Sequence, residues 1–220
     1  MSLALYGHPF SSYTQKVLIA LYENDTPFDF RSLDQAMPDN LAEWKRRWPL
    51  RKFPLLLDGE VDIAESSIII EHLQLAHPGP LALLPADPRA ALAVRFLDRF
   101  FDLHVMQPMQ DVVAAALTGD AAKREEGVEK GRKLLERAYA WLETRLAGAS
   151  AWVAGEDFTL ADCAAAPSLF YADWVHPISE RYPAVRAYRA RLLARPSFAR
   201  AVDEARPFRS YFPLGAPDRD

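Results

Sequence analysis

The hydrophobic and polar positions of the chain follow two different patterns, and the change between them comes near residue 80. An apolar run at residues 3–6 is typical of a buried strand, and residues 28–33 alternate with the period of two expected of a half-buried strand. Helical spacing of apolar residues occupies 11–24 and returns at 65–73. Strand, helix and strand in this order predict a right-handed βαβ unit, so the first part of the chain is expected to be a small α/β domain.

A hairpin is predicted between the two helical stretches. Apolar runs at 54–57 and 60–63 flank Asp58-Gly59, and a two-residue Asp-Gly link between such runs is a strong hairpin signal. The polar stretch at 44–48 has no clear period and is expected to be a loop or an irregular helix. The predicted element order of this domain is therefore β-α-β, β-β-α.

Two adjacent serines mark the start of the first helix. Ser12 and Gln15, three residues later, form a capping-box pair, which predicts that Ser12 is the N-cap. Ser11 then lies just outside the helix, and its hydroxyl is expected to be free for chemistry. Thr159 and Asp162 form a second capping box in the later part of the chain, and that box is expected to be purely structural.

Beyond residue 80 the pattern is helical throughout. Prolines at 78, 80, 85 and 88 predict a linker, because each proline fixes φ and removes a hydrogen-bond donor. The predicted division is an α/β domain over 1–79, a proline-rich linker over 80–88 and an all-helical domain over 89–220. The helices expected in the last domain lie at about 89–117, 121–147, 160–173, 183–194 and 197–205. Pro108 should kink the first of them.

Composition places the chain among ordinary globular proteins. Of its 220 residues, 50% are hydrophobic and 25% are charged, and a net charge of -4 gives no bulk attraction to nucleic acid or anionic lipid. No window approaches the ~18 uninterrupted apolar residues of a transmembrane helix, and the N-terminus lacks a signal-peptide pattern. Cys163 is the single cysteine, so we expect no disulfide and a cytoplasmic location. No residues have the spacing of metal ligands, and no metal is expected.

Three separated segments of the first domain are predicted to present polar groups at one end of its sheet. They are the Ser11-Ser12 turn, the Lys52-Phe53-Pro54 bend and the Glu65-Ser66 helix start. Ligands of α/β sheets collect where strands lead into helices, because free backbone amides and the helix dipole favour anions there. Together the segments predict a pocket for one small polar ligand.

The same segments match a known family. The order LYGHPFSSYTQKVLIAL, KFPLLLDGEVDIAESSIIIEHL and GEDFTLADCAAAP resembles cytosolic glutathione transferases over nearly the whole chain. The resemblance implies a thioredoxin-like α/β first domain and an all-α helical-bundle second domain. It also implies a serine-type enzyme with an active-site turn similar to those of bacterial, theta and zeta members. Such an enzyme lowers the thiol pKa of bound glutathione for attack on an electrophilic small molecule or a peroxide, typically in detoxification.

The resemblance assigns the parts of glutathione to residues of this chain. Glu65 would pair with the ammonium of the amino-acid head, and Ser66, with its helix-start amide, would hold the adjacent carboxylate. The backbone of Phe53, turned outward by a cis bond to Pro54, would pair with the cysteinyl unit. Lys52 is the candidate for the glycine carboxylate.

For the sulfur, the resemblance points to the start of the first helix. Serine-type members have a serine where Ser11 stands, and cysteine-type members have Cys there or at the position of Tyr13. A hydroxyl at Ser11 is therefore expected to stabilise the thiolate, with Ser12 beside it and Tyr6 as the alternative. Lowering a thiol pKa of ~8.5 by ~2 units takes ~2.7 kcal/mol. One charge-assisted hydrogen bond of ~1.5–3 kcal/mol and a helix terminus of ~0.3–1 kcal/mol suffice for this.

The electrophile would meet the sulfur between the two domains. Its expected wall consists of large apolar and aromatic side chains near that junction: Phe10, His104, Met106, Met109, Trp174, Phe208, Tyr211 and Phe212. Family members usually dimerise, so the resemblance implies a homodimer. Two other functions stay open: a glutathione-dependent isomerase of the zeta type, which has Cys where this chain has Tyr13, and a non-catalytic binding protein of the same fold.

Overall fold

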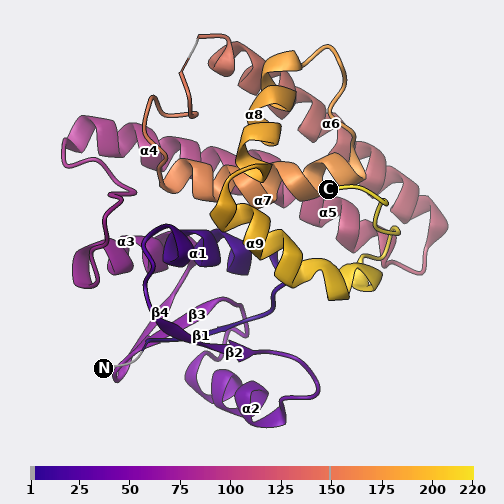
Figure 1. Cartoon of the computed structure of the whole chain (residues 1–220). Coiled ribbons are helices and arrows are strands. Elements are labelled where there is room, and N and C mark those ends of the chain that lie inside the picture. The colour runs from indigo at the N-terminus through magenta and orange to yellow at the C-terminus, as the bar shows by residue number, and fades with distance from the viewer. Residues whose placement is uncertain (1–2, 149) are drawn as a thin grey trace.

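The computed structural model describes residues 3–148 and 150–220. In chain order its elements are β1 (Leu3–Gly7), α1 (Ser12–Glu23), β2 (Phe28–Ser32), α2 (Pro38–Arg47), β3 (Leu55–Asp58), β4 (Val61–Ala64), α3 (Ser66–Ala76), α4 (Pro88–Phe100), the π-helix η1 (Phe101–Met106), α5 (Gln107–Ala116), α6 (Ala121–Leu146), α7 (Leu160–Val175), α8 (Pro183–Leu193), α9 (Pro196–Ala205) and the 3-10 helix η2 (Arg206–Tyr211). A sheet domain is followed by a larger helical part (Figure 1), in the predicted order. The domain limits at 1–79, 80–88 and 89–220 stay predictions. No helix in the described part is long and apolar enough to cross a membrane.

The sheet has four strands in the order β2-β1-β3-β4. β1 and β2 are parallel, as the crossover through α1 requires, and β3 is antiparallel to both β1 and β4. The predicted hairpin is therefore present between β3 and β4. Its two-residue turn is Gly59-Glu60 rather than Asp58-Gly59, because Asp58 still pairs with Val61, and Gly59 takes a φ of 60°.

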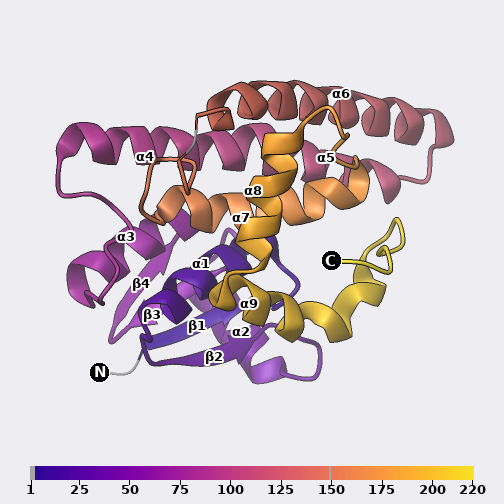
Figure 2. The same cartoon turned by 45° about the horizontal axis from the view of Figure 1, so that its top comes forward.

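Helices cover both faces of this sheet (Figure 2). α1 and α3 lie between the sheet and the helical part, and their apolar side chains join Leu5 and Leu56 in the main core. α2 covers the opposite face, where Trp44 packs with Tyr6 and Leu55. Because successive residues of a strand point to opposite faces, neighbouring residues Leu5 and Tyr6 belong to different layers.

The polar stretch around Trp44 is part of a regular α-helix, so the prediction of a loop or an irregular helix is wrong. Pro38 occupies the first turn of α2, where its missing N–H costs nothing. Lys45, Arg46 and Arg47 occupy the last turn, where basic side chains interact favourably with the helix dipole. Trp44 is the buried residue of the helix. Leu41, Trp44 and Trp48 stand at helical spacing and pack on one cluster, so the helical period is visible only when the stretch is read from Leu41 onward.

A π-helical segment divides the first long helix of the helical part. α4 ends at Phe100, and α5 begins at Gln107 after the π-segment. Pro108 follows directly, and a proline has no N–H to donate to the carbonyl four residues earlier. The predicted irregularity at Pro108 thus takes the form of a widened turn just before it.

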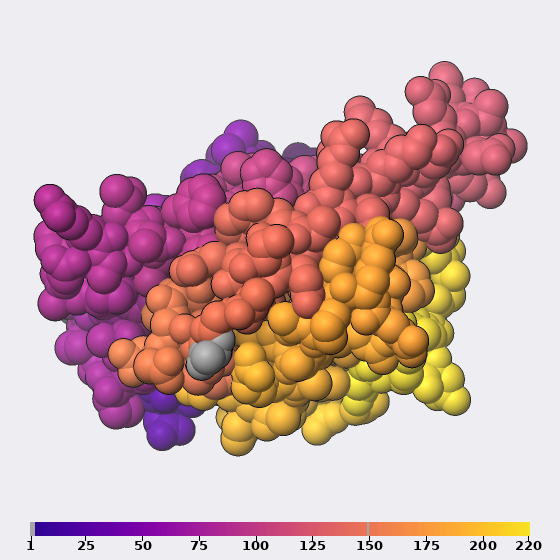
Figure 3. All heavy atoms as spheres, turned by 90° about the horizontal axis from the view of Figure 1, so that it is seen from above, coloured from indigo at the N-terminus to yellow at the C-terminus, as the bar shows by residue number. Residues whose placement is uncertain are grey.

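α7 is the central helix of the helical part and is buried along almost its whole length. Its start carries the predicted capping box, in which the Thr159 backbone N–H donates to Asp162 Oδ2 at 2.9 Å. Asp162 also accepts hydrogen bonds from the Tyr188 hydroxyl at 2.5 Å and from the Val153 N–H at 3.2 Å. Seen from above, the helical part covers the sheet domain, and the α5–α6 end projects from the body (Figure 3).

A buried ionic cluster joins the sheet domain to the helical part. The Lys16 side chain on α1 is 1% exposed, and its ammonium lies 2.6 Å from Asp98 of α4 and 3.1 Å from Asp102 of the π-segment. Ser67 of α3 accepts a hydrogen bond from Lys16 at 2.9 Å and donates one to Asp98 at 2.8 Å. The cluster therefore links α1 and α3 of the sheet domain to α4 and the π-segment of the helical part.

Candidate functional site

Two adjoining cavities lie where the sheet domain meets the helical part. One of about 620 Å³ is bounded by α3 and α4, and we call it the α3 cavity. The other, of about 520 Å³, reaches α5 and the residues after η2, and we call it the C-terminal cavity. Tyr13, Lys52, Phe53 and Gln107 line both, so the cavities meet along one shared wall. Each has the volume of an ordinary small-ligand site.

The α3 cavity brings together every residue that the sequence predicts for glutathione binding: Lys52, Phe53, Pro54, Glu65 and Ser66. The Phe53–Pro54 peptide bond is cis, as the resemblance implied. The loop before β3 is held against α2, because the Trp44 indole N–H donates to the Lys52 carbonyl at 3.1 Å. Phe53 itself remains 37% exposed at the cavity.

The start of α3 differs from an ordinary helix cap. Glu65 is the N-cap residue with a φ of 70°, and its side chain makes no capping hydrogen bond. A positive φ costs a non-glycine residue on the order of 1–3 kcal/mol, and such residues cluster at ligand sites. The Glu65 carboxylate is exposed at the cavity, and Ser66 brings the first free amides of α3 to the same wall. This helix start can hold a cationic and an anionic group side by side.

The capping role that the sequence predicts for Ser12 belongs to Ser11. Ser11 is the N-cap, since its Oγ accepts from the Thr14 backbone N–H at 3.3 Å, so the prediction that Ser12 caps the helix is wrong. Ser12 is the first helical residue, is 3% exposed, and its hydroxyl has no hydrogen-bond partner within the described structure. Both serines line the C-terminal cavity. Two hydroxyls and the first amides of α1 therefore border the same space.

Tyr6, the alternative partner for the sulfur, lines neither cavity. Its side chain is 1% exposed and packs under α2 on the opposite face of the sheet. The Tyr6 hydroxyl donates to Glu43 at 2.6 Å. Burial, helped by the Glu43 carboxylate, raises the pKa of Tyr6 to about 12. Tyr6 is thus a structural residue of the α2 layer.

Four of the predicted wall residues line the C-terminal cavity: Phe10, Met109, Tyr211 and Phe212. Trp174 lies behind them, with its ring 5.1 Å from that of Phe212. Phe208 packs against His8 at 4.6 Å between ring centroids.

His104 and Met106 do not belong to this wall. His104 lies with Phe100, at 5.5 Å between ring centroids, in a separate depression between α4 and α6. Met106 is buried in the core. The prediction of His104 as a wall residue is wrong, because its side chain lies on the side of the helix that faces α6.

Two family models match the chain. The model of the glutathione S-transferase N-terminal domain matches residues 5–81, and that of the C-terminal domain matches residues 124–191. A probable maleylacetoacetate isomerase of Vibrio cholerae is 29% identical over 214 residues, which cover 94% of this chain and 98% of that relative. A glutathione-bound glutathione S-transferase of Methylobacillus flagellatus is 27% identical, with a TM-score of 0.76 over 91% of this chain and 98% of that one.

A glutathione S-transferase of Methylobacterium radiotolerans, solved in complex with glutathione sulfonate, is 32% identical to this chain. The similarity covers 92% of this chain and 95% of that one, with a TM-score of 0.77. The chain belongs to the glutathione S-transferase family. The predicted family and the predicted fold, a thioredoxin-like domain followed by a helical domain, are confirmed. The serine type stays a prediction.

Two residues on the wall shared by the two cavities of this glutathione S-transferase, Tyr13 and Gln107, were not predicted as site residues from the sequence. Tyr13 lies at their junction, and burial together with the Asp102 carboxylate raises its pKa to about 12, so the hydroxyl is protonated at neutral pH. The sequence feature that could have identified Tyr13 as a site residue is its position directly after the serine pair. Gln107 reaches the same wall as the first residue after the π-segment, and Pro108 indicated an irregularity there but not which residue would face the cavity.

The charged residues around the α3 cavity fit a ligand that carries both positive and negative groups. Glu65, Asp98 and Asp102 contribute carboxylates, and Lys52 and Arg99 contribute cations. Burial raises the pKa of Asp102 above its usual range, and the Lys16 ammonium opposes this. Glutathione has one ammonium and two carboxylates, so the residues present can hold it without an added ion.

Proposed function

We propose that this protein is a glutathione transferase that binds glutathione in the α3 cavity with the sulfur directed at the start of α1. The observation that supports the proposal is that the loop before β3 and the start of α3 line one cavity, which adjoins the serine pair. Glu65 would pair with the ammonium of the head, and Ser66 would hold its carboxylate. Lys52 would pair with the glycine carboxylate, and the Phe53 backbone with the cysteinyl unit.

Ser11 is the proposed partner of the sulfur. Its oxygen accepts from the Thr14 N–H, so its own proton is available for donation into the cavity. The Ser12 oxygen is buried, which makes it the less direct donor. A hydrogen bond to a thiolate worth about 1.5–3 kcal/mol lowers the thiol pKa by about 1–2 units, and the α1 dipole adds to this. The thiolate would then form a bond to an electrophilic carbon while the leaving group departs with its electron pair.

Conjugation of glutathione to a panel of aryl halides and epoxides, with hydroperoxide reduction measured in parallel, tests the proposal. We expect turnover with at least one class, and we expect Ser11→Ala to reduce kcat by about ten- to a hundredfold through its lost hydrogen bond. Ser12→Ala and Tyr6→Phe are the controls and should stay within about threefold of the parent. Unchanged turnover in Ser11→Ala, with loss in Ser12→Ala, would transfer the role to Ser12.

Glutathione-dependent isomerisation is a second candidate, since the Vibrio cholerae relative is named as a probable maleylacetoacetate isomerase. In such a reaction a thiolate adds to a cis double bond, the bond rotates, and the thiolate leaves again. Tyr13 stands where the zeta type has Cys, and its side chain lies on the wall shared by the two cavities. Measured cis–trans isomerisation of maleylacetoacetate, against conjugation of the same enzyme, decides between the two reactions. Binding of glutathione without any turnover would indicate a non-catalytic role.

A homodimer and a cytoplasmic location complete the proposal. Leu92 and Phe96 of α4 are 67% and 58% exposed, and Leu103 beside them is 51% exposed. An apolar stripe of this kind on one side of a helix is typical of an interface with another subunit. Light scattering should give twice the monomer mass, and Phe96→Glu should return the monomer while leaving glutathione binding in place. A lone buried cysteine agrees with a reducing compartment.

A further inference from the structure

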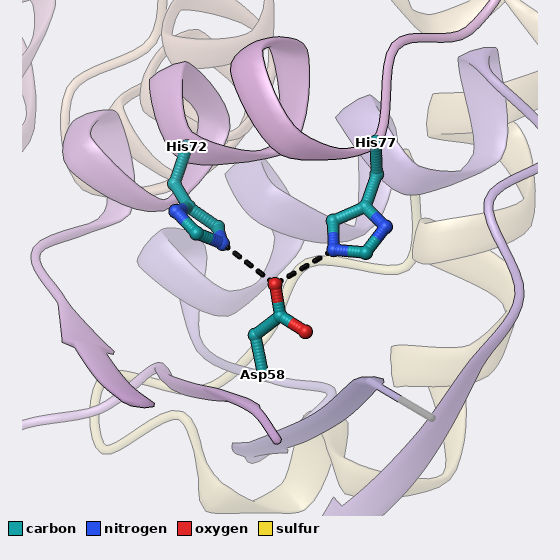
Figure 4. A group of neighbouring side chains, drawn as sticks. All are labelled: Asp58, His72 and His77. Carbon is teal, nitrogen blue, oxygen red and sulfur yellow. Dashed lines mark hydrogen bonds and ion pairs between the residues drawn. The ribbon is translucent and has the colours of Figure 1, made fainter. Parts of the chain in front are cut away.

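Outside the two cavities, three potential metal ligands meet at the far end of α3. They are Asp58, the last residue of β3, His72 within α3, and His77, which follows α3 as its C-cap. Asp58 Oδ2 lies 2.9 Å from His72 Nε2 and 2.7 Å from His77 Nε2 (Figure 4). The three ligand atoms all lie within 4.8 Å of one another. The three side chains are between 17% and 30% exposed, so an ion from solvent can reach them.

The fold positions each ligand independently of the others. Asp58 is held by strand pairing with both Leu3 and Val61, directly before the two-residue turn. His72 and His77 are five positions apart, and two such residues of a continuous helix point to different sides. His77 faces His72 because it has left the helix, with φ -133° and ψ 57° before Pro78, which disfavours helical geometry in the preceding residue. The site depends on this helix end.

We propose that Asp58, His72 and His77 form a binding site for a first-row divalent cation, with Zn²⁺ as the ion that fits best. Imidazole nitrogen is a preferred ligand of these ions, and two histidines with one carboxylate leave a fourth, tetrahedral position for water. Ligand atoms of a tetrahedral zinc site lie about 3.4 Å apart at metal–ligand distances of about 2.1 Å. The two separations from Asp58 Oδ2, 2.9 and 2.7 Å, need to grow by less than about 1 Å, and the separation of the two Nε2 atoms, at most 4.8 Å, needs to shrink by no more than about 1.4 Å. The C-terminal end of the α3 dipole also favours a cation at this place.

Each imidazole would bind the ion through Nε2, the atom that lies at hydrogen-bond distance from Asp58 Oδ2. A neutral ring bound in this way carries its proton on Nδ1. The Nδ1 atoms point away from Asp58 and can carry this proton (Figure 4). The bound ion would cross-link the end of the β3–β4 hairpin to the end of α3.

Isothermal titration of the whole protein with Zn²⁺, without glutathione because its thiol binds zinc, tests the site. We expect one high-affinity ion per chain, together with a thermal midpoint that rises with the Zn²⁺ concentration. His72→Asn and His77→Gln keep an N–H donor for Asp58 but remove the imidazole. Each should weaken Zn²⁺ binding at least tenfold, because losing a direct ligand costs no less than losing an outer hydrogen-bond partner of a metal site.

His104→Asn is the matched control, because His104 is an exposed histidine outside the cluster, and its Zn²⁺ affinity should equal that of the parent. Circular dichroism and retention on immobilised glutathione establish that each variant is folded. The proposal fails if the parent binds no Zn²⁺ at 100-fold excess. It also fails if His72→Asn and His77→Gln bind like the parent, in which case the cluster is only a hydrogen-bonded link. Neither failure affects the proposed transferase activity, which involves other residues.

Discussion

Substituting Lys16 by Met should destabilise the protein strongly. Met has nearly the length of the Lys stem, so packing is kept while the charge between Asp98 and Asp102 is removed. Both carboxylates are almost completely buried, at 2% and 6% exposure, and Lys16 contacts each of them directly. Breaking a buried ion pair by removing one partner typically costs about 3–5 kcal/mol, because it leaves an uncompensated charge. In a chain of this size that corresponds to a fall in Tm of roughly 6–20 °C.

The pH dependence of this loss follows from Asp102. Burial holds the pKa of Asp102 above its usual range, and the Lys16 ammonium is the main influence that lowers it. A carboxyl group with a raised folded-state pKa favours folding when protonated, and this contribution is lost as the pH rises through that pKa. Removing Lys16 raises the pKa further. The difference in unfolding free energy between variant and parent should therefore grow as the pH increases from about 4 towards 7.

Urea unfolding followed by tryptophan fluorescence measures the effect. Lys123→Met is the control, since Lys123 is an exposed residue with one partner 3.7 Å away, and its change should stay within about 0.5 kcal/mol. The combination of Lys16→Met with Asp98→Asn and Asp102→Asn should recover most of the loss, because no buried charge remains. A cost below about 1 kcal/mol for Lys16→Met at pH 7, or a gap that narrows with rising pH, would refute the reasoning.

Three further outcomes are expected. Glu65→Ala should abolish retention on immobilised glutathione, whereas Glu65→Gln, which keeps a hydrogen-bond acceptor, should leave a weaker but measurable retention. In Ser11→Ala the apparent thiol pKa in the kcat/KM profile should rise by about 1–2 units; an unshifted profile would exclude Ser11 as the donor. Gly131→Ala would place a Cβ 2.9 Å from the Pro108 carbonyl oxygen and against Val112, so a loss of about 1–3 kcal/mol in unfolding free energy is expected, whereas Gly119→Ala, with open space around it, should be neutral.

Several features of this protein could be predicted from the sequence because each depends on a pattern of neighbouring residues. Strand alternation and helical spacing located most elements within a few residues, since burial of one face imposes a period of 2 or 3.6. The Thr159–Asp162 capping box was predicted correctly because it involves one helix turn only. The Ser11–Ser12 turn shows the limit of such rules. Two adjacent serines each satisfy a capping pattern, and the choice between them depends on how α1 packs.

The tertiary structure decided what the local patterns left open. Leu5 and Tyr6 point to opposite faces of the sheet, and only the packing of α1 on one face and α2 on the other shows that Tyr6 lies away from both cavities. The tertiary structure likewise places His104 in the depression between α4 and α6, away from the predicted wall.

The sequence by itself thus determined the family, the two-part fold and the five predicted residues of the α3 cavity, because each of their motifs is contiguous in the chain. Only the tertiary structure placed Tyr13 at the junction of the two cavities. It alone brought Asp58 to His72 and His77, which are separated by a turn, a strand and most of a helix. Contacts of this kind depend on how β3 pairs within the sheet and on where α3 ends. No single stretch of sequence encodes the distance between these two elements.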